Sequence, residues 1–243
     1  MNRTIATTKR ILLQVRHDHR TIALIILVPT ILMGILSWML SGIPNAFNEW
    51  GGPLLGIFPL IVMFLITSVA TLRERVNGTL ERLLTLPIKR IEFIGAYALS
   101  FCVLGAIQAM VAASTSIYVF GLDTNGNTWA VVIVAILDAV LGTALGLLAS
   151  AMARTEFQAV QFMPVFLIPQ FLLGGFIISR EDLPRILHYI SDLMPLSYSI
   201  DALNLALAGG ALGGSFWGNI AKVIGFALVA LFLGGMTLRR SSK

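Results

Sequence analysis

Six apolar segments, each long enough to cross a bilayer, recur along this chain of 243 residues. A transmembrane helix needs about 20 predominantly apolar residues, and lipid leaves the backbone polar groups no partner outside a helix or closed barrel. With 57% hydrophobic and 12% charged residues, the chain could not solvate its surface as a water-soluble domain. We therefore predict one all-α integral membrane domain over residues 1–243. The predicted spans are residues 21–40, 52–72, 93–120, 129–153, 157–178 and 217–238.

The positions of the basic residues predict the orientation of these spans. Six spans place both termini on one side of the membrane, and fourteen of the 17 Lys and Arg residues fall on that side. Two, Arg180 and Arg185, fall on the other side, and Lys222 lies within the sixth span. By the positive-inside rule, both termini and residues 73–92 are expected in the cytoplasm. The basic pI is then a consequence of topology, and no nucleic-acid partner is needed to explain it.

Three shorter helices are predicted outside the spans. Residues 1–20 combine five basic residues with an apolar face, a pattern typical of a helix lying along the membrane surface. Between the fifth and sixth spans, residues 179–216 contain two short apolar helical patterns separated by Pro195. Neither is long enough to span, so we predict two re-entrant or interfacial helices there.

A long polar segment, residues 73–92, separates the second and third spans. Asn77-Gly78 is a turn signal, Thr79 can cap a short helix, and Glu81 suits its first turn. Pro87 ends that helix after about two turns. Its pattern is amphipathic, so the charged face is presented to a partner in the water phase. Alternatively, the segment is a basic loop whose apolar face rests on the lipid.

Motifs for enzymatic chemistry are absent from the sequence. There is no phosphate-binding loop of the G-x-x-x-x-G-K-[ST] type and no Cys/His cluster with metal-ligand spacing. We therefore predict a protein that is not an enzyme and that carries no metal or cofactor of its own.

Asp138 is the acid that lies well inside a predicted span. A carboxylate there costs about 2.5–3.5 kcal/mol on insertion scales, so it should be protonated, paired or facing water. It either lines a path or proton-linked cavity, or makes a structural hydrogen bond to a neighbour such as Gln108 or Thr143. Gln108, Gln161 and Gln170 are further intramembrane polar candidates for the path, although such groups more often bond between helices.

The polar segment carries the motif R-E-R-x-x-G-T-x-E-x-L-L-x-x-P, formed here by Arg73-Glu74-Arg75, Gly78-Thr79, Glu81, Leu83-Leu84 and Pro87. This motif resembles the cytoplasmic loop of type-2 ATP-binding cassette (ABC) exporter permeases. The basic N-terminal helix and the outer helix pair before the last span are similar to that family as well, so the resemblance covers essentially the whole chain. One departure is Asn204, which stands near a position where the family often has arginine.

The resemblance implies a permease without an ATPase of its own. Two cytoplasmic ABC ATPase subunits, which carry the ATP and Mg²⁺, would dock on it, and a second copy or a related permease would pair with it in the membrane lipid. The short helix around residues 79–86 would be the coupling helix seated on the ATPase. Of the contact residues, Glu81 and Arg82 are expected to be polar contacts, with Leu83 and Leu84 packed beneath them and Thr79 and Pro87 at the two ends.

The implied function is ATP-driven export from a bacterial cell, through its plasma (inner) membrane. The cargo would be a hydrophobic or amphipathic compound, such as a drug, an antibiotic or a lipid-like molecule. Because the sequence shows no large outer domain, we expect the small drug-resistance type. Two alternatives remain: a non-transporting membrane anchor or regulator of a partner ATPase, and an intramembrane enzyme built around Asp138.

Overall fold

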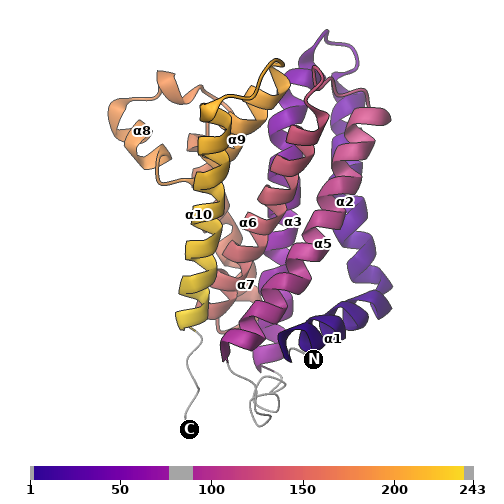
Figure 1. Cartoon of the computed structure of the whole chain (residues 1–243), viewed down its shortest axis with the longest axis vertical. Coiled ribbons are helices and arrows are strands. Elements are labelled where there is room, and N and C mark those ends of the chain that lie inside the picture. The colour runs from indigo at the N-terminus through magenta and orange to yellow at the C-terminus, as the bar shows by residue number, and fades with distance from the viewer. Residues whose placement is uncertain (1–2, 77–89, 238–243) are drawn as a thin grey trace.

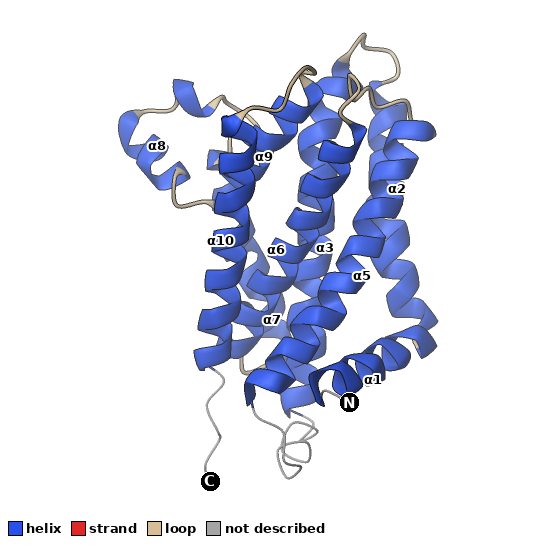
Figure 2. Ribbon diagram, in the orientation of Figure 1, coloured by secondary structure: helices blue, strands red, loops and turns tan. Residues whose placement is uncertain are grey.

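A computed structural model describes residues 3–76 and 90–237 of the chain. These residues form an all-helical bundle without strands (Figure 2). Six of its helices are long and apolar enough to cross a membrane, which confirms the predicted all-α membrane fold. They are α2 (His19–Leu40), α3 (Ala46–Val76), α5 (Arg90–Tyr118), α6 (Thr128–Met152), α7 (Glu156–Leu173) and α10 (Gly214–Thr237).

The helix boundaries depart most from the prediction in α3 and α7. α3 is longer than the predicted 52–72, since it includes polar residues at both ends. α7 is shorter than the predicted 157–178 and ends at Leu173. Gly175 adopts a φ of +86°, in the left-handed region that favours glycine and terminates helices. The two prolines inside α7, Pro164 and Pro169, do not interrupt it.

α6 lies at the centre of the bundle and packs against α3 at backbone distance. A Cβ placed on Gly142 would lie 2.3 Å from the carbonyl oxygen of Leu60, and one on Gly146 would lie 2.6 Å from that of Phe64. Both distances are too short for any side chain. The two glycines therefore let the axes of α3 and α6 approach more closely than larger residues would permit.

The predicted N-terminal amphipathic helix is present as α1 (Arg3–His17). It crosses the end of the bundle at which both termini lie (Figure 1). Ile11 is buried against the bundle while Ile5 is exposed. The Thr8 hydroxyl donates to the carbonyl oxygen of Ala96 on α5 (3.4 Å), and the Ser100 hydroxyl donates back to that of Thr8 (3.4 Å). α1 is thus fixed to α5 in both directions.

At the opposite end, the chain between α7 and α10 forms the two predicted short helices. α8 (Arg185–Ser191) follows the 3₁₀ turn η1 (Arg180–Asp182) and is largely exposed. α9 (Pro195–Leu207) enters the bundle and packs against α3, α6 and α10. Its buried side chains include Leu196, Ile200 and Leu203. The two helices therefore differ in burial, a distinction that their sequence patterns did not show.

The turn between α5 and α6 ties α9 to the rest of the bundle. The Asn125 side-chain amide donates to the carbonyl oxygen of Leu207 (2.5 Å). Asn127 donates to the carbonyl oxygens of Ala206 (3.2 Å) and Gly210 (3.1 Å). These bonds occupy backbone acceptors that the end of α9 leaves free. The polar turn over residues 123–127 thus holds the end of α9 in place.

Candidate functional site

The end of α3 that leads into residues 77–89 is braced against two other helices. The Arg73 guanidinium donates to both carboxylate oxygens of Glu156, at the start of α7, with two bonds of 2.8 Å. Arg75 donates to the carbonyl oxygen of Ser150 on α6. A forked arginine–carboxylate contact fixes direction as well as distance. The last turn of α3 is thus tied to both α6 and α7.

α1 is connected to the same turn of α3. The Gln14 side-chain amide donates to the Glu74 carboxylate (3.3 Å). Since α1 is also bonded to α5, it joins the two helices that enter and leave residues 77–89. The six residues predicted to contact an ATPase lie outside the described residues, and their assignment stays a prediction. They are Thr79, Glu81, Arg82, Leu83, Leu84 and Pro87.

Asp138 is fully buried inside the bundle. Its carboxyl group lies against Gly56 of α3, where an added Cβ would come within 2.2 Å of Oδ2. The buried hydroxyl of Ser199 on α9 faces the same carboxyl. Among the described residues, neither Gln108 nor Thr143 bonds to Asp138, and the Thr143 hydroxyl donates instead to Ala139 (3.0 Å). The expected partner was therefore wrong, because α9 occupies that side of α6.

The three candidate glutamines lie in different surroundings and do not form one site. Gln170 is buried and bridges two helices, donating to the carbonyl oxygen of Phe166 (2.8 Å) and accepting from the backbone N–H of Leu196 (3.2 Å). Gln108 is buried, and neither of its amide atoms has a partner within the described chain. Gln161 is exposed on α7. Gln170 has a structural role, at the N-terminus of α9.

An arginine in the segment between α7 and α10, with a side chain only 11% exposed, was missed by sequence reasoning. Arg180 donates to the carboxylates of Asp192 and Asp201, and its guanidinium carbon lies 5.0 Å from the ring centroid of Tyr198. The Nζ atom of Lys222 lies 4.3 Å from the centroid of the same ring, which accounts for a lysine within the sixth span. The signal was present: Arg180 is one of the two basic residues on the side poor in positive charge.

The close-contact glycines of α6 were also missed. Gly142 and Gly146 are four residues apart, and this small-x-x-x-small spacing is typical of close helix packing in membranes.

In the described part of the chain, no group of three or more His, Cys, Asp or Glu residues could hold a metal ion. The candidate site therefore consists of side-chain contacts between helices near residues 77–89, together with separate buried polar groups.

The profile of ABC-2 type transporters matches residues 2–207, most of the chain. The chain belongs to the ABC-2 type transporter family. This ABC-2 protein is 28% identical to the linearmycin resistance permease protein LnrN of Bacillus subtilis, over 76% of this chain and 48% of that protein. It is 26% identical to the probable multidrug ABC transporter permease YbhS of Escherichia coli, over 63% of this chain and 41% of the relative.

A third relative is also named as a permease. The inner membrane transport permease YhhJ of Escherichia coli is 27% identical over 69% of this chain and 46% of its own length. The matched region thus spans about half the length of each of these relatives. The family match and the six candidate spans make this ABC-2 chain a multi-pass membrane protein, and the three relatives are themselves named as permeases.

Proposed function

We propose that this chain is the membrane subunit of an ATP-driven exporter whose ATPase is a separate cytoplasmic protein. The observation that carries the proposal is the bracing of α3 at Arg73 and Arg75, directly before residues 77–89. Those residues contain the motif that resembles a coupling helix. The names of the relatives support a hydrophobic or amphipathic cargo, such as a drug or an antibiotic.

The bracing suggests how movement of the coupling segment would reach the membrane. A displacement of residues 77–89 pulls on the end of α3, and α3 is bonded there to α6 and α7. α5, at the other end of the segment, is bonded to α1. Because packed helices shift as units, closure of an ATPase dimer beneath this end would tilt several spans together. Glu81 and Arg82 would form the polar contacts with the ATPase, above Leu83 and Leu84.

The proposed assembly contains two permease subunits and two ATPase subunits, with both termini in the cytoplasm. α2 and α7 leave most of their residues outside the protein core. Apolar side chains such as Leu24 and Ile31 on α2 and Val165 and Ile168 on α7 are exposed. Faces of this kind suit either lipid or a second permease. ATP and Mg²⁺ would be held by the partner alone.

The test is to purify the tagged chain from its native gene context in mild detergent and to identify what accompanies it. We expect a soluble protein with a phosphate-binding loop and ATPase activity. Glu81→Ala and Leu84→Asp should each prevent its recovery, while the membrane subunit keeps its melting temperature. Glu49→Ala is a matched control, because Glu49 is an exposed acid at the opposite end of α3.

Normal recovery of the ATPase with both variants would overturn the coupling assignment. Recovery of the ATPase without movement of any amphiphile in reconstituted vesicles would instead indicate a membrane anchor or regulator. Recovery of the chain without an ATPase, with its own dimer intact, would contradict the exporter and direct attention to Asp138.

A further inference from the structure

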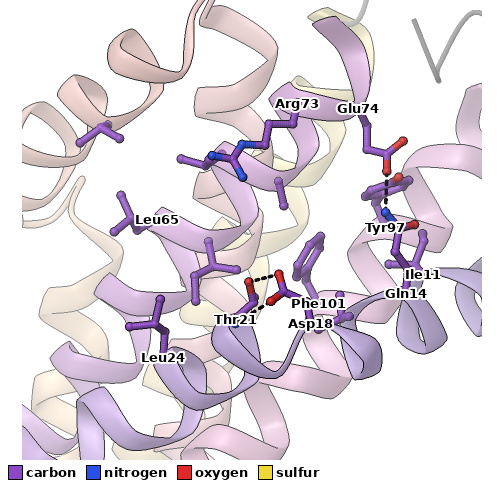
Figure 3. A pocket seen from close by; sticks show the side chains of 15 residues that line it. Ile11, Gln14, Asp18, Thr21, Leu24, Leu65, Arg73, Glu74, Tyr97 and Phe101 are labelled. Carbon is purple, nitrogen blue, oxygen red and sulfur yellow. Dashed lines mark hydrogen bonds between the residues drawn. The ribbon is translucent and has the colours of Figure 1, made fainter. Parts of the chain in front are cut away.

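A cavity of about 550 Å³ lies between α1, α2, α3 and α5 near the end of the bundle that carries the termini (Figure 3). Its volume is in the range of small-molecule binding pockets, about 300–1,000 Å³. One part of its wall is apolar and includes Leu24, Leu65 and Phe101. The other part is polar and includes Asp18 and Glu74. The cavity is thus amphipathic, with its polar part beside the membrane-surface helix α1.

The two carboxylates carry the charge that is left unpaired in this wall. Asp18 accepts hydrogen bonds from the backbone N–H (3.2 Å) and the hydroxyl (2.6 Å) of Thr21. Glu74 accepts one from the neutral Gln14 amide (3.3 Å). Within residues 3–76 and 90–237, neither carboxylate forms an ion pair. Neutral donors orient both groups, although Asp18 also lies near the charges of Arg20 and Arg73, and Tyr97 contacts both Glu74 and Arg10.

The arginine in the cavity wall is already engaged. Both donor atoms that Arg73 directs to Glu156 form bonds of 2.8 Å, so its charge is matched by a carboxylate outside the cavity wall. Arg20, close to Asp18, and Arg10, which contacts Tyr97 and has two buried guanidinium nitrogens without a partner in the described chain, are the other nearby cations, and both lie outside the cavity lining. Neither forms an ion pair with the cavity acids in the described chain. The polar part of the wall therefore favours a positive group and disfavours a purely anionic one.

We propose that this cavity binds an amphiphile with a cationic amine head group and a hydrocarbon tail, taken from the leaflet on the side of the termini. The head group would lie between Asp18 and Glu74, since hydrogen bonds between an ammonium group and a carboxylate are stronger than neutral ones. The tail would lie along Leu24, Leu65 and Phe101, where burial of apolar area stabilises it. This inference rests on the proposed exporter, because it names the class of cargo that the permease would collect.

Binding can be measured without transport, in purified protein. The first probe is phosphatidylethanolamine, compared by native mass spectrometry with phosphatidylglycerol of the same acyl chains, which lacks the amine. The second is radiolabelled dodecyltrimethylammonium, bound to protein in phosphatidylglycerol nanodiscs. We expect at least a tenfold preference for the amine lipid, and saturable binding of the free cation. If only one probe depends on the variants below, that result identifies the source of the ligand as lipid or free amphiphile.

The variant to test is the double substitution Asp18→Asn/Glu74→Gln. Asparagine is as good a helix N-cap as aspartate, and glutamine keeps an oxygen for Gln14, so the charge is lost while the bonds remain. Glu49→Gln/Asp123→Asn removes two exposed acids at the opposite end of the bundle and is the matched control. We expect the first double variant to bind either probe at least tenfold more weakly, and the control to bind normally.

A second variant tests whether the ligand occupies the cavity, by filling the space with a larger side chain. Leu65→Trp should fill the apolar part and abolish binding of both probes, with the melting temperature showing whether the fold is kept. Equal retention of the two lipids, or unchanged binding by the Asp18→Asn/Glu74→Gln protein, would overturn the inference. Amine-selective binding by a protein that recruits no ATPase would overturn the exporter and leave the cavity assignment intact. If the protein transports in an ATP-dependent way but its cavity binds amine and non-amine lipids equally, the cavity assignment is overturned and the exporter stands.

Discussion

Asp18 joins α1 to α2 and serves both helices. Its carboxylate caps the first turn of α2 through Thr21, while its backbone N–H donates to the carbonyl oxygen of Val15 at the end of α1 (2.9 Å). The hydrogen bond from the Thr21 hydroxyl lowers the pKa of the Asp18 carboxyl below its ordinary value of 3.8. The folded protein therefore binds this proton less readily than the unfolded chain does.

This difference gives a pH dependence with a definite sign. A lowered pKa in the folded state contributes stability that is fully present above the ordinary pKa and is lost as pH falls through the folded value. We expect the melting temperature of Asp18→Asn, measured in detergent, to fall less steeply than that of the wild type below about pH 4. At pH 7 the cap should remain, because asparagine accepts the same bond. An unchanged acid slope would contradict this role.

Asp138 is a second residue with a definite expectation. It packs between Gly56 and Ser199 in the interior, away from the exposed face of α7. We therefore expect Asp138→Asn, which keeps shape and polarity, to fold and to transport normally. Asp138→Leu should lower the free energy of unfolding by about 1–3 kcal/mol, because its added volume meets α3 where a Cβ on Gly56 has no space.

The measurement is thermal unfolding together with uptake of a fluorescent amphiphile by inverted vesicles. Loss of transport in Asp138→Asn, with the ATPase still bound and the fold intact, would contradict the structural role. Asp138 would then be assigned to the transport path or to chemistry.

At the scale of helices, the contact between α3 and α6 depends on two glycines. Gly142→Ala would place a Cβ against the backbone of Leu60, which cannot rotate away as a side chain could. We expect the free energy of unfolding to fall by about 1–3 kcal/mol. Gly225→Ala in α10 is the control, because its Cβ would meet nothing within 4 Å. Equal melting temperatures for the two variants would show that α3 and α6 separate without cost.

The Arg73–Glu156 pair is a contact between helices in which position is expected to count more than stability. The Arg73 side chain is 60% exposed and the Glu156 side chain is 49% exposed. Exposed ion pairs contribute little to stability. We expect Arg73→Glu to keep its melting temperature and to lose transport several-fold per ATP hydrolysed. The exchange Arg73→Glu/Glu156→Arg should recover most of the lost transport. Transport by the single variant at the wild-type rate would show that this clamp does not carry motion.

Across the whole molecule, the charge asymmetry predicts which ends face the cytoplasm. In a Cys102→Ser background, Asp123→Cys lies in the exposed α5–α6 turn and Arg154→Cys in the exposed α6–α7 turn. We expect an impermeant maleimide to label Asp123→Cys in intact cells, and Arg154→Cys only after the membrane is opened. The opposite pattern would reverse the topology derived from the basic residues.

The spans were predictable because their signal is local: 20 apolar residues in lipid have few alternatives to a helix. The residue at which α7 ends and the burial of α9 inside the bundle could not be predicted, since both depend on neighbours distant in sequence. Gly175 ends α7 within an apolar run that continues to residue 178, and Gln170 holds the start of α9 inside the bundle. The path candidates failed to converge for the same reason, because periodicity places a glutamine on a helix but does not say which helix covers it.

The close contact between α3 and α6 has one more consequence, for stiffness. A lone helix of 31 residues is about 45 Å long, and thermal bending over that length would absorb a small rotation applied at one end. Two helices in backbone contact at Gly142 and Gly146 resist bending together, as a thicker beam does. A small angular change at the end of α3 that leads into residues 77–89 would then arrive at the far end with little attenuation. The two glycines would thereby make α3 and α6 stiffer as a pair than either helix is alone.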